Sequence, residues 1–170
     1  MSEQFLYQKL DILKEADTLK ELPEILEKGL SQNILLREYQ KDAFQYFITY
    51  FENDKLSGNK QLHTLFHMAT GSGKTLIMAG LILYLYIKGY RNFIFFVNQT
   101  NVIEKTKENF LNEFSSKYLF NKDIEYLGEK IKIKMVNNFQ NLLLDNNEIN
   151  ICFTSTQKLH LDLLPYEIKY

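Results

Sequence analysis

The chain has 170 residues, of which 45% are hydrophobic and 24% charged, a balance typical of one globular α/β domain rather than two. Its formal net charge of −1 excludes a global basic field, so any contact with nucleic acid has to be local. The single cysteine, Cys152, stands in the apolar run "INICF", which indicates a core residue and no disulfide framework.

The sequence favours a cytoplasmic protein without a membrane partner. Its start lacks the charged segment and apolar core of a signal peptide. The most apolar run, Leu76 to Ile87, is shorter than a membrane span and ends at Lys88 and Gly89.

Residues 1–35 are predicted to form a short helical arm. Apolar residues share one helical face in its first half, at Leu6, Leu10 and Leu13. A second short helix is expected to open at Leu22–Pro23 and to end at Gly29. The arm carries no recognisable chemistry, and we interpret it as packing on a main domain that spans residues 36–170.

The main domain is predicted to begin with a helix from Leu36, since apolar residues recur at steps of three and four. They are Tyr39, Ala43, Phe44, Phe47, Ile48 and Phe51. After a turn-rich loop, "QLHTLFHMA" (61–69) predicts a short strand. A glycine loop then leads into a helix of about fifteen residues from Gly73. Because this helix is apolar on nearly every side, we expect it to lie deep against a sheet.

The rest of the chain alternates strands and helices. "RNFIFFVN" predicts a strand buried on both faces, and Thr100 is expected to cap the helix that follows. "EKIKIKMV" alternates strictly, which predicts a strand with one wet face. "INICFTS" predicts another buried strand, and "QKLHLDLL" a last short helix. This order favours a parallel sheet covered by helices.

The loop "MATGSGKT" (68–75) is the strongest chemical signal in the sequence. Gly71 and Gly73 let the backbone curl so that successive N–H groups bind phosphate oxygens, and the start of the following helix adds partial positive charge. Lys74 is expected to reach the β- and γ-phosphates, and the Thr75 hydroxyl to bind Mg²⁺. The predicted ligand is ATP with Mg²⁺, bound by Thr70, Gly71, Ser72, Gly73, Lys74 and Thr75.

The general phosphate-loop pattern has glycine six residues before the lysine, where this chain has Met68. The variant resembles the "MATGSGKT" and "MATGTGKT" loops of superfamily 2 helicases and translocases, and above all the motor subunit of type III restriction enzymes. The resemblance runs from about Leu36 to Leu164. It implies a RecA-like parallel sheet of the P-loop NTPase class, with helices on its faces.

In these motors a glutamine about thirty residues upstream of the loop recognises adenine, and "LREYQKDAF" places Gln40 there. A glutamine amide pairs a donor and an acceptor with the edge of adenine, whereas guanine mismatches it. The resemblance therefore assigns Gln40 to the base of ATP.

Two further stretches resemble nucleic-acid-binding elements of the same motors, each at the end of a predicted strand. The first implies backbone contacts from Asn98, Gln99 and Thr100. The second implies contacts from Thr154, Ser155, Thr156 and Gln157 through hydroxyls, an amide and helix-terminal N–H groups. DNA is the expected partner.

The resemblance also implies parts that these 170 residues do not contain. They are an aspartate–glutamate strand that holds Mg²⁺ and positions the attacking water (the Walker B strand), a second motor domain with an arginine finger, and a nuclease domain. We therefore expect an incomplete sheet, an isolated chain that is nearly inactive as an ATPase, and self-association through the sheet edge. A methyltransferase subunit is the implied protein partner.

Several other features are interpreted as structural. Asp162, Glu167 and Lys169 resemble a nuclease set only superficially, since that chemistry needs two neighbouring strands that converge on one metal. On a strand, His63 and His67 would lie about 13 Å apart, beyond shared metal coordination. Three alternating lysines are interpreted as edge-strand charges that block aggregation: Lys130, Lys132 and Lys134.

Three alternatives to a type III motor remain open. One is a non-enzymatic module that holds nucleotide or blocks a partner, and another is the motor of a different defence helicase. The third is a small P-loop kinase, but such enzymes use several arginines on the transferred phosphate, and this chain has only Arg37 and Arg91.

Overall fold

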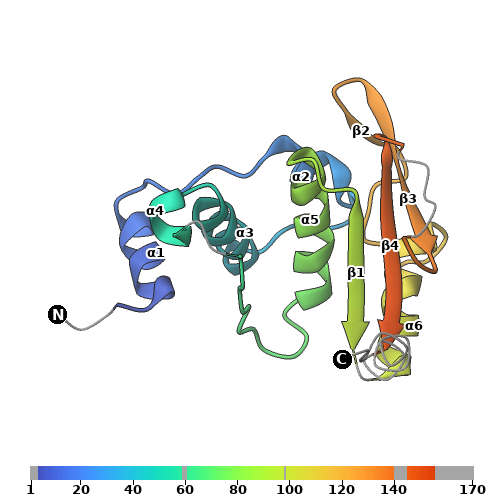
Figure 1. Ribbon diagram of the computed structural model, residues 1–170, viewed down its shortest axis with the longest axis horizontal. Helices are drawn as coiled ribbons and strands as arrows, with labels where there is room; N and C mark the ends of the chain where they lie inside the picture. Colours follow the sequence, from blue (N-terminus) through green and yellow to red (C-terminus); the bar gives the residue numbers. More distant parts are fainter. Residues whose placement is uncertain (1–3, 59–60, 98, 140–144, 156–170) are drawn as a thin grey trace, which may run out of the picture.

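The computed structural model describes residues 4–58, 61–97, 99–139 and 145–155 (Figure 1). In chain order its elements are α1 (Leu6–Glu15), α2 (Glu24–Gly29), α3 (Glu38–Phe51), α4 (Asp54–Ser57), α5 (Lys74–Ile87), β1 (Asn92–Val97), α6 (Thr100–Leu111), β2 (Ile124–Tyr126), β3 (Glu129–Val136) and β4 (Glu148–Ser155). The expected helix 157–164 lies outside the described residues.

The strands form one sheet in the order β1-β4-β3-β2, flanked by helices. β1 and β3 both pair with β4 in parallel, and β2 joins β3 as an antiparallel hairpin. A parallel sheet covered by helices was predicted, so the mixed α/β class is confirmed. The short antiparallel strand β2 was not foreseen.

β4 has the burial that its sequence predicted, and β1 does not. Residues 149–152 of β4 are all buried, with Ile149 and Ile151 in the hydrophobic core, and β4 lies between β1 and β3 in the sheet. β1 alternates exposed and half-buried residues, with Ile94 56% and Phe96 51% exposed. The prediction that β1 is buried on both faces was therefore wrong. An apolar run shows that a strand has no polar face, but not how many of its faces are covered.

The strand predicted at residues 61–69 is not formed. Residues 61–69 have no regular structure up to the glycine loop. Leu62, Phe66 and Met68 still pack against the core. A strand needs a neighbour to take its backbone hydrogen bonds, and none of the described strands lies beside this segment. Its apolar side chains are therefore anchored without a sheet ladder.

α5 lies at the centre of the molecule, between α3 and β1 in Figure 1. Eight of its fourteen residues are buried: Leu76, Ile77, Ala79, Gly80, Ile82, Leu83, Tyr84 and Tyr86. α2 packs against it through Leu26, and α3 through Phe44, which are 1% and 0% exposed. The predicted deep helix is confirmed, and none of the described helices is long and apolar enough to cross a membrane.

α6 covers the sheet by packing on β4, β1 and β3. Its buried apolar side chains are Ile103 and Phe110, and the Phe110 ring meets Phe153 of β4 edge-on at 6.2 Å between centroids. The helix begins at Thr100, whereas the N-cap position belongs to Gln99, whose side chain makes no capping hydrogen bond. The prediction that Thr100 caps α6 was therefore wrong by one residue.

β3 shows the predicted wet face. Lys130, Lys132 and Lys134 are exposed, while Ile131 is buried. β3 pairs with β2 through residues 129–131 and with β4 through residues 132–136, so each half has a registered neighbour on one side only. Lys130 binds Asp123 at 2.9 Å, and Lys134 forms an ion pair with Glu148. These two lysines thus have partners within the fold.

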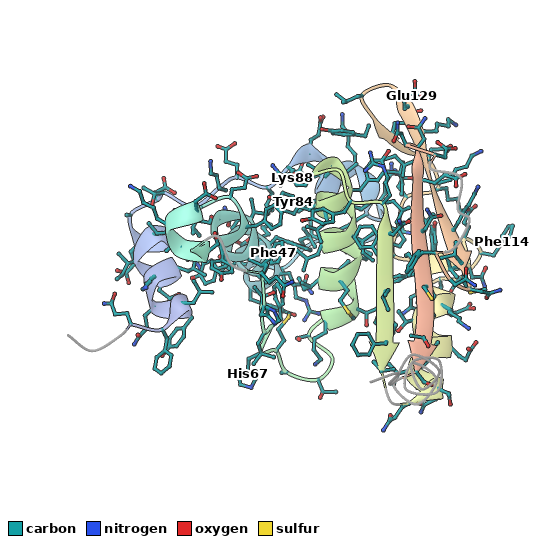
Figure 2. All side chains as sticks on the ribbon, viewed as in Figure 1. Phe47, His67, Tyr84, Lys88, Phe114 and Glu129 are labelled. Carbon is teal, nitrogen blue, oxygen red and sulfur yellow. The ribbon has the colours of Figure 1, made fainter. Side chains whose placement is uncertain are left out.

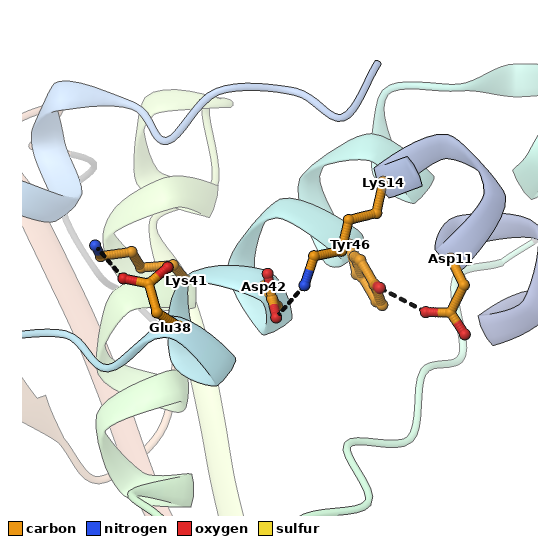
Figure 3. A network of polar contacts seen from close by, with 6 residues as sticks. All are labelled: Asp11, Lys14, Glu38, Lys41, Asp42 and Tyr46. Carbon is orange, nitrogen blue, oxygen red and sulfur yellow. Dashed lines mark hydrogen bonds and ion pairs between the residues drawn. The ribbon is translucent and has the colours of Figure 1, made fainter. Parts of the chain in front are cut away.

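Polar contacts join α1 to α3 (Figure 3). The Tyr46 hydroxyl donates to Asp11 at 2.6 Å, and Lys14 pairs with Asp42 at 2.6 Å. Burial and this hydrogen bond raise the pKa of Tyr46. Leu10 is the one buried residue of α1. The division into an arm of residues 1–35 and a main domain stays a prediction.

Gly80 allows α3 and α5 to approach closely, and this generates a first prediction. A Cβ at Gly80 would lie 2.4 Å from Cζ of Phe44, a rigid ring in a filled core. We expect Gly80→Ala to lower the free energy of unfolding by about 1–2 kcal/mol, since overpacking outweighs the gain in helix propensity. Urea denaturation measures the change.

Gly29→Ala is the matched control. A Cβ there would meet the flexible end of Leu83 at 2.8 Å, which can turn away, so the loss of stability should be smaller. Phe44→Leu should partly restore the stability of Gly80→Ala. If both glycine variants lose the same amount, the ring contact is not what limits the helix approach.

Glu52 joins three segments at the far end of α5. Its carboxylate accepts from the Tyr84 hydroxyl at 2.9 Å and pairs with Lys88 at 2.6 Å and Lys20 at 3.7 Å. Figure 2 labels Tyr84 of α5 and Lys88, which directly follows this helix. The hydrogen bond from Lys88 is the largest cause that holds the pKa of Glu52 below its ordinary value of 4.5.

A group with a lowered pKa in the folded state stabilises the fold above its unfolded pKa and loses this effect as the pH falls. Glu52→Gln should therefore cost roughly 1 kcal/mol at pH 7 and progressively less from about pH 4.5 downward. Denaturant titrations at pH 7, 4.5 and 3 measure this window. Glu21→Gln, at an exposed glutamate without an ion pair among the described residues, should change nothing. An equal cost at pH 3 would contradict the assignment.

Candidate functional site

The glycine loop, residues 68–75, lies at the end of α5 that faces the carboxyl ends of β1 and β4 (Figure 1). In open α/β sheets, ligands bind outside these strand ends. The loop is mostly accessible, with Ala69, Thr70, Gly71 and Lys74 exposed. The C-terminal end of the loop is fixed in position, because α5 is anchored in the core from Leu76 onward.

Two glycines give the loop its curl. Gly71 has a φ of 80° and Gly73 a φ of 93°, in the left-handed region that side chains disfavour. Gly73 is also the N-cap of α5, so the N–H groups of the first helical turn have no partner within the helix. Curled backbone and helix start together form an environment that attracts anions, as the sequence predicted.

Lys74 lies across the loop. Its Nζ donates to the carbonyls of Met68 at 3.1 Å and Ala69 at 2.8 Å. The ammonium group is therefore held over the loop backbone instead of extending into solvent. Ser72 closes the turn from inside, since its Oγ donates to the Ala69 carbonyl at 2.7 Å. Because the lysine has a third donor and stays exposed, it is placed to meet an anion at the loop.

The Ser72 carbonyl is the main anchor between the loop and α3. It accepts a hydrogen bond from Nε2 of Gln40 at 2.9 Å and another from the Tyr39 hydroxyl at 3.0 Å. Both lone pairs of this oxygen are thus occupied. Arg37 in turn donates from Nη1 to the Tyr39 hydroxyl at 3.3 Å. The segment "REYQ" therefore holds the loop by hydrogen bonds from side chains.

Gln40 is 5% exposed, and its neighbours set the orientation of its amide. Oε1 accepts from the Arg37 backbone N–H at 3.0 Å, while Nε2 donates to the loop. One acceptor and one donor position remain, the pair that an adenine edge needs. The assignment of Gln40 to adenine stays a prediction, but its place beside the loop fits that role.

Thr70 and Thr75 have different surroundings. Thr70 is exposed in the turn, and Thr75 is half-buried in the first turn of α5, directly after Lys74. Among the described residues, no three His, Cys, Asp or Glu side chains are grouped to hold a metal ion. A hydroxyl is a weak ligand by itself, so Thr75 fits a Mg²⁺ ion that phosphate oxygens also hold.

The two predicted nucleic-acid elements are neighbours in space. β1 and β4 pair in register up to Val97 and Ser155, so Gln99 and Thr100, which follow β1, lie at the same sheet end as Thr154 and Ser155. Gln99 and Thr100 are exposed, whereas Thr154 is 8% exposed. Asn98, Thr156 and Gln157 lie outside the described residues. The DNA contacts stay a prediction.

Tyr39 is the site residue that sequence reasoning missed. It was assigned to the apolar stripe of its helix, yet it is 41% exposed and its hydroxyl bonds the loop. A signal was available, because Tyr39 precedes Gln40 and its neighbours Glu38 and Lys41 are polar. A tyrosine on the polar side of a helix often has a partner for its hydroxyl.

Within the described part of the chain, the remaining features form no hydrogen bond with the side chains of the loop. His63 and His67 are exposed. Arg91 donates to the carbonyls of Tyr86 and Tyr90, just past the far end of α5, and stacks on the Tyr86 ring at 4.0 Å. The nuclease-like set of Asp162, Glu167 and Lys169 lies outside the described residues.

Comparisons with known proteins agree with the sequence motifs. Residues 33–169 match the family model described as "Type III restriction enzyme, res subunit". The chain is 42% identical over 147 residues to a protein of Haemophilus influenzae named "Probable type III restriction-modification enzyme HindVIP Res subunit". The match covers 84% of this chain and 28% of that protein. No solved structure matches the chain. Since the family model matches more than half of its residues, the chain belongs to the family of type III restriction enzyme res subunits.

Proposed function

We propose that this chain is the ATP-binding part of a RecA-like motor domain. In the full-length cytoplasmic protein, ATP hydrolysis would drive movement along DNA beside a methyltransferase subunit. The observation that carries the proposal is the glycine loop, with Gly71 and Gly73 in left-handed conformations and Lys74 across it. The relative of 42% identity has "restriction-modification" in its name, which fits this setting.

The loop is proposed to bind the phosphates of ATP and to neutralise part of their negative charge. Loop N–H groups and Lys74 would bind the phosphates, and Thr75 would help to hold a Mg²⁺ ion that neutralises phosphate charge. Hydrolysis is attack of water on the γ-phosphate, whose developing charge Lys74 stabilises. The isolated 170 residues are expected to bind ATP but to turn it over very slowly.

The arginines argue against a small kinase. Arg91 is engaged at the far end of α5 by two carbonyls and the ring of Tyr86. Only Arg37 lies near the loop, where it bonds Tyr39. A kinase needs several arginines on the transferred phosphate, and the described part of the chain gathers no such group.

The first test is a titration of the purified chain with a fluorescent ATP analogue and Mg²⁺. Lys74→Ala should weaken binding at least about tenfold, because it removes a charge-assisted contact to phosphate. Lys88→Ala, at the other end of the same helix, is the control and should leave binding unchanged. Equal affinity of Lys74→Ala and wild type would overturn the phosphate-loop assignment.

A second titration addresses base selection. Wild type should prefer the ATP analogue to the GTP analogue, and Gln40→Ala should remove the preference, since the amide can pair with adenine. The ratio of the two affinities is the readout, because Gln40→Ala also loosens the loop and weakens both nucleotides together. A preference that persists in Gln40→Ala would place adenine recognition on other residues.

A further inference from the structure

The Ser72 carbonyl accepts two side-chain hydrogen bonds, one from Gln40 at 2.9 Å and one from Tyr39 at 3.0 Å. The family resemblance assigned a role to Gln40 and none to Tyr39. Tyr39 is 41% exposed, so its ring contributes little to the core. Its hydroxyl accepts from Arg37 and donates to the loop, which orients it.

Fixing a carbonyl fixes the whole peptide group that contains it. The peptide between Ser72 and Gly73 is trans, as are all described peptide bonds, so the N–H of Gly73 points opposite to the Ser72 carbonyl. Tyr39 and Gln40 pull that carbonyl toward α3. The N–H of Gly73 is thereby turned away from α3, at the N-cap position where the loop meets the helix start.

Gly73 cannot hold this orientation unaided. It has no side chain, and its φ of 93° lies in a region that glycine enters and leaves at little cost. One hydrogen bond from Gln40 leaves the peptide free to rotate about that contact, whereas a second donor at the same oxygen limits its rotation. The pair of donors therefore sets the loop in one conformation before an anion arrives.

We propose that Tyr39 is a positioning residue of the phosphate loop, which acts through the Ser72 carbonyl to aim the Gly73 N–H at a bound phosphate. The inference rests on the proposed function and goes beyond it, because it separates the role of Tyr39 from recognition of the base. A residue that acts on the loop affects every ligand with phosphates. A residue that touches adenine affects only ligands with a base.

Calorimetric titration of the full chain with ATP and with inorganic tripolyphosphate, each with Mg²⁺, separates these roles. Tyr39→Phe keeps the ring and removes the hydroxyl. Its affinity for both ligands should fall by the same factor, about three- to tenfold for one lost hydrogen bond. The unfolding temperature should stay at the wild-type value, because the side chain is largely exposed.

Tyr90→Phe is the matched control. Tyr90 is 51% exposed and its hydroxyl has no hydrogen bond to any described residue, so both affinities should remain those of wild type. A loss for ATP alone would make Tyr39 a base contact and overturn the inference. Unchanged affinities in Tyr39→Phe would overturn it as well, while the proposed function would stand. Failure of wild type to bind either ligand would instead defeat the proposed function, and the inference with it.

Discussion

The close approach of α3 to α5, made possible by two glycines, is the constraint on which the rest of the structure depends. A Cβ at Gly80 would lie 2.4 Å from Phe44, and one at Gly73 would lie 2.5 Å from Nε2 of Gln40. Gln40 and Phe44 are one helical turn apart on α3, and the two glycines are two turns apart on α5. The same face of α3 thus meets α5 in the core and at the loop.

This arrangement explains why the loop is both exposed and ordered. α5 is apolar on nearly all sides, so burial fixes the position of its axis. The loop directly precedes the N-terminal end of this helix. Apolar packing places the helix but does not choose among the conformations of a glycine. Hydrogen bonds from α3 make that choice at the Ser72 carbonyl. Core packing and loop geometry are therefore set by one helix pair.

The electrostatics of the loop are local, as the net charge of −1 requires. Lys74 is held over the backbone by two carbonyls, and the N–H groups of the α5 start lie beside it. The partial positive charge at the start of a helix and one ammonium group together attract a phosphate, so a basic surface is not required. By contrast, Lys130 and Lys134 are engaged with carboxylates of the fold.

Sequence periodicity predicted α3, α5 and α6, because they bury apolar side chains that recur at helical spacing, but it missed the short helix α4 in the predicted turn-rich loop. It failed for residues 61–69 and for β1, where the outcome depends on which strands are neighbours. Pairing and the number of covered faces are tertiary properties that a single run of residues does not contain. The loop residues were found from their spacing, whereas the role of Tyr39 depends on a contact 33 residues away in the chain.

The register of β1 on β4 brings the two predicted DNA elements to the same end of the sheet. Six consecutive pairs run from Asn92 and Asn150 to Val97 and Ser155, so both strands end together, about 4.8 Å apart. A slip of one residue would change every cross-strand pair and would offset the two ends. Burial of Ile149 and Ile151 holds the register. Because the loop lies at this same end of the molecule, the predicted phosphate site and the predicted DNA elements share one end of the fold.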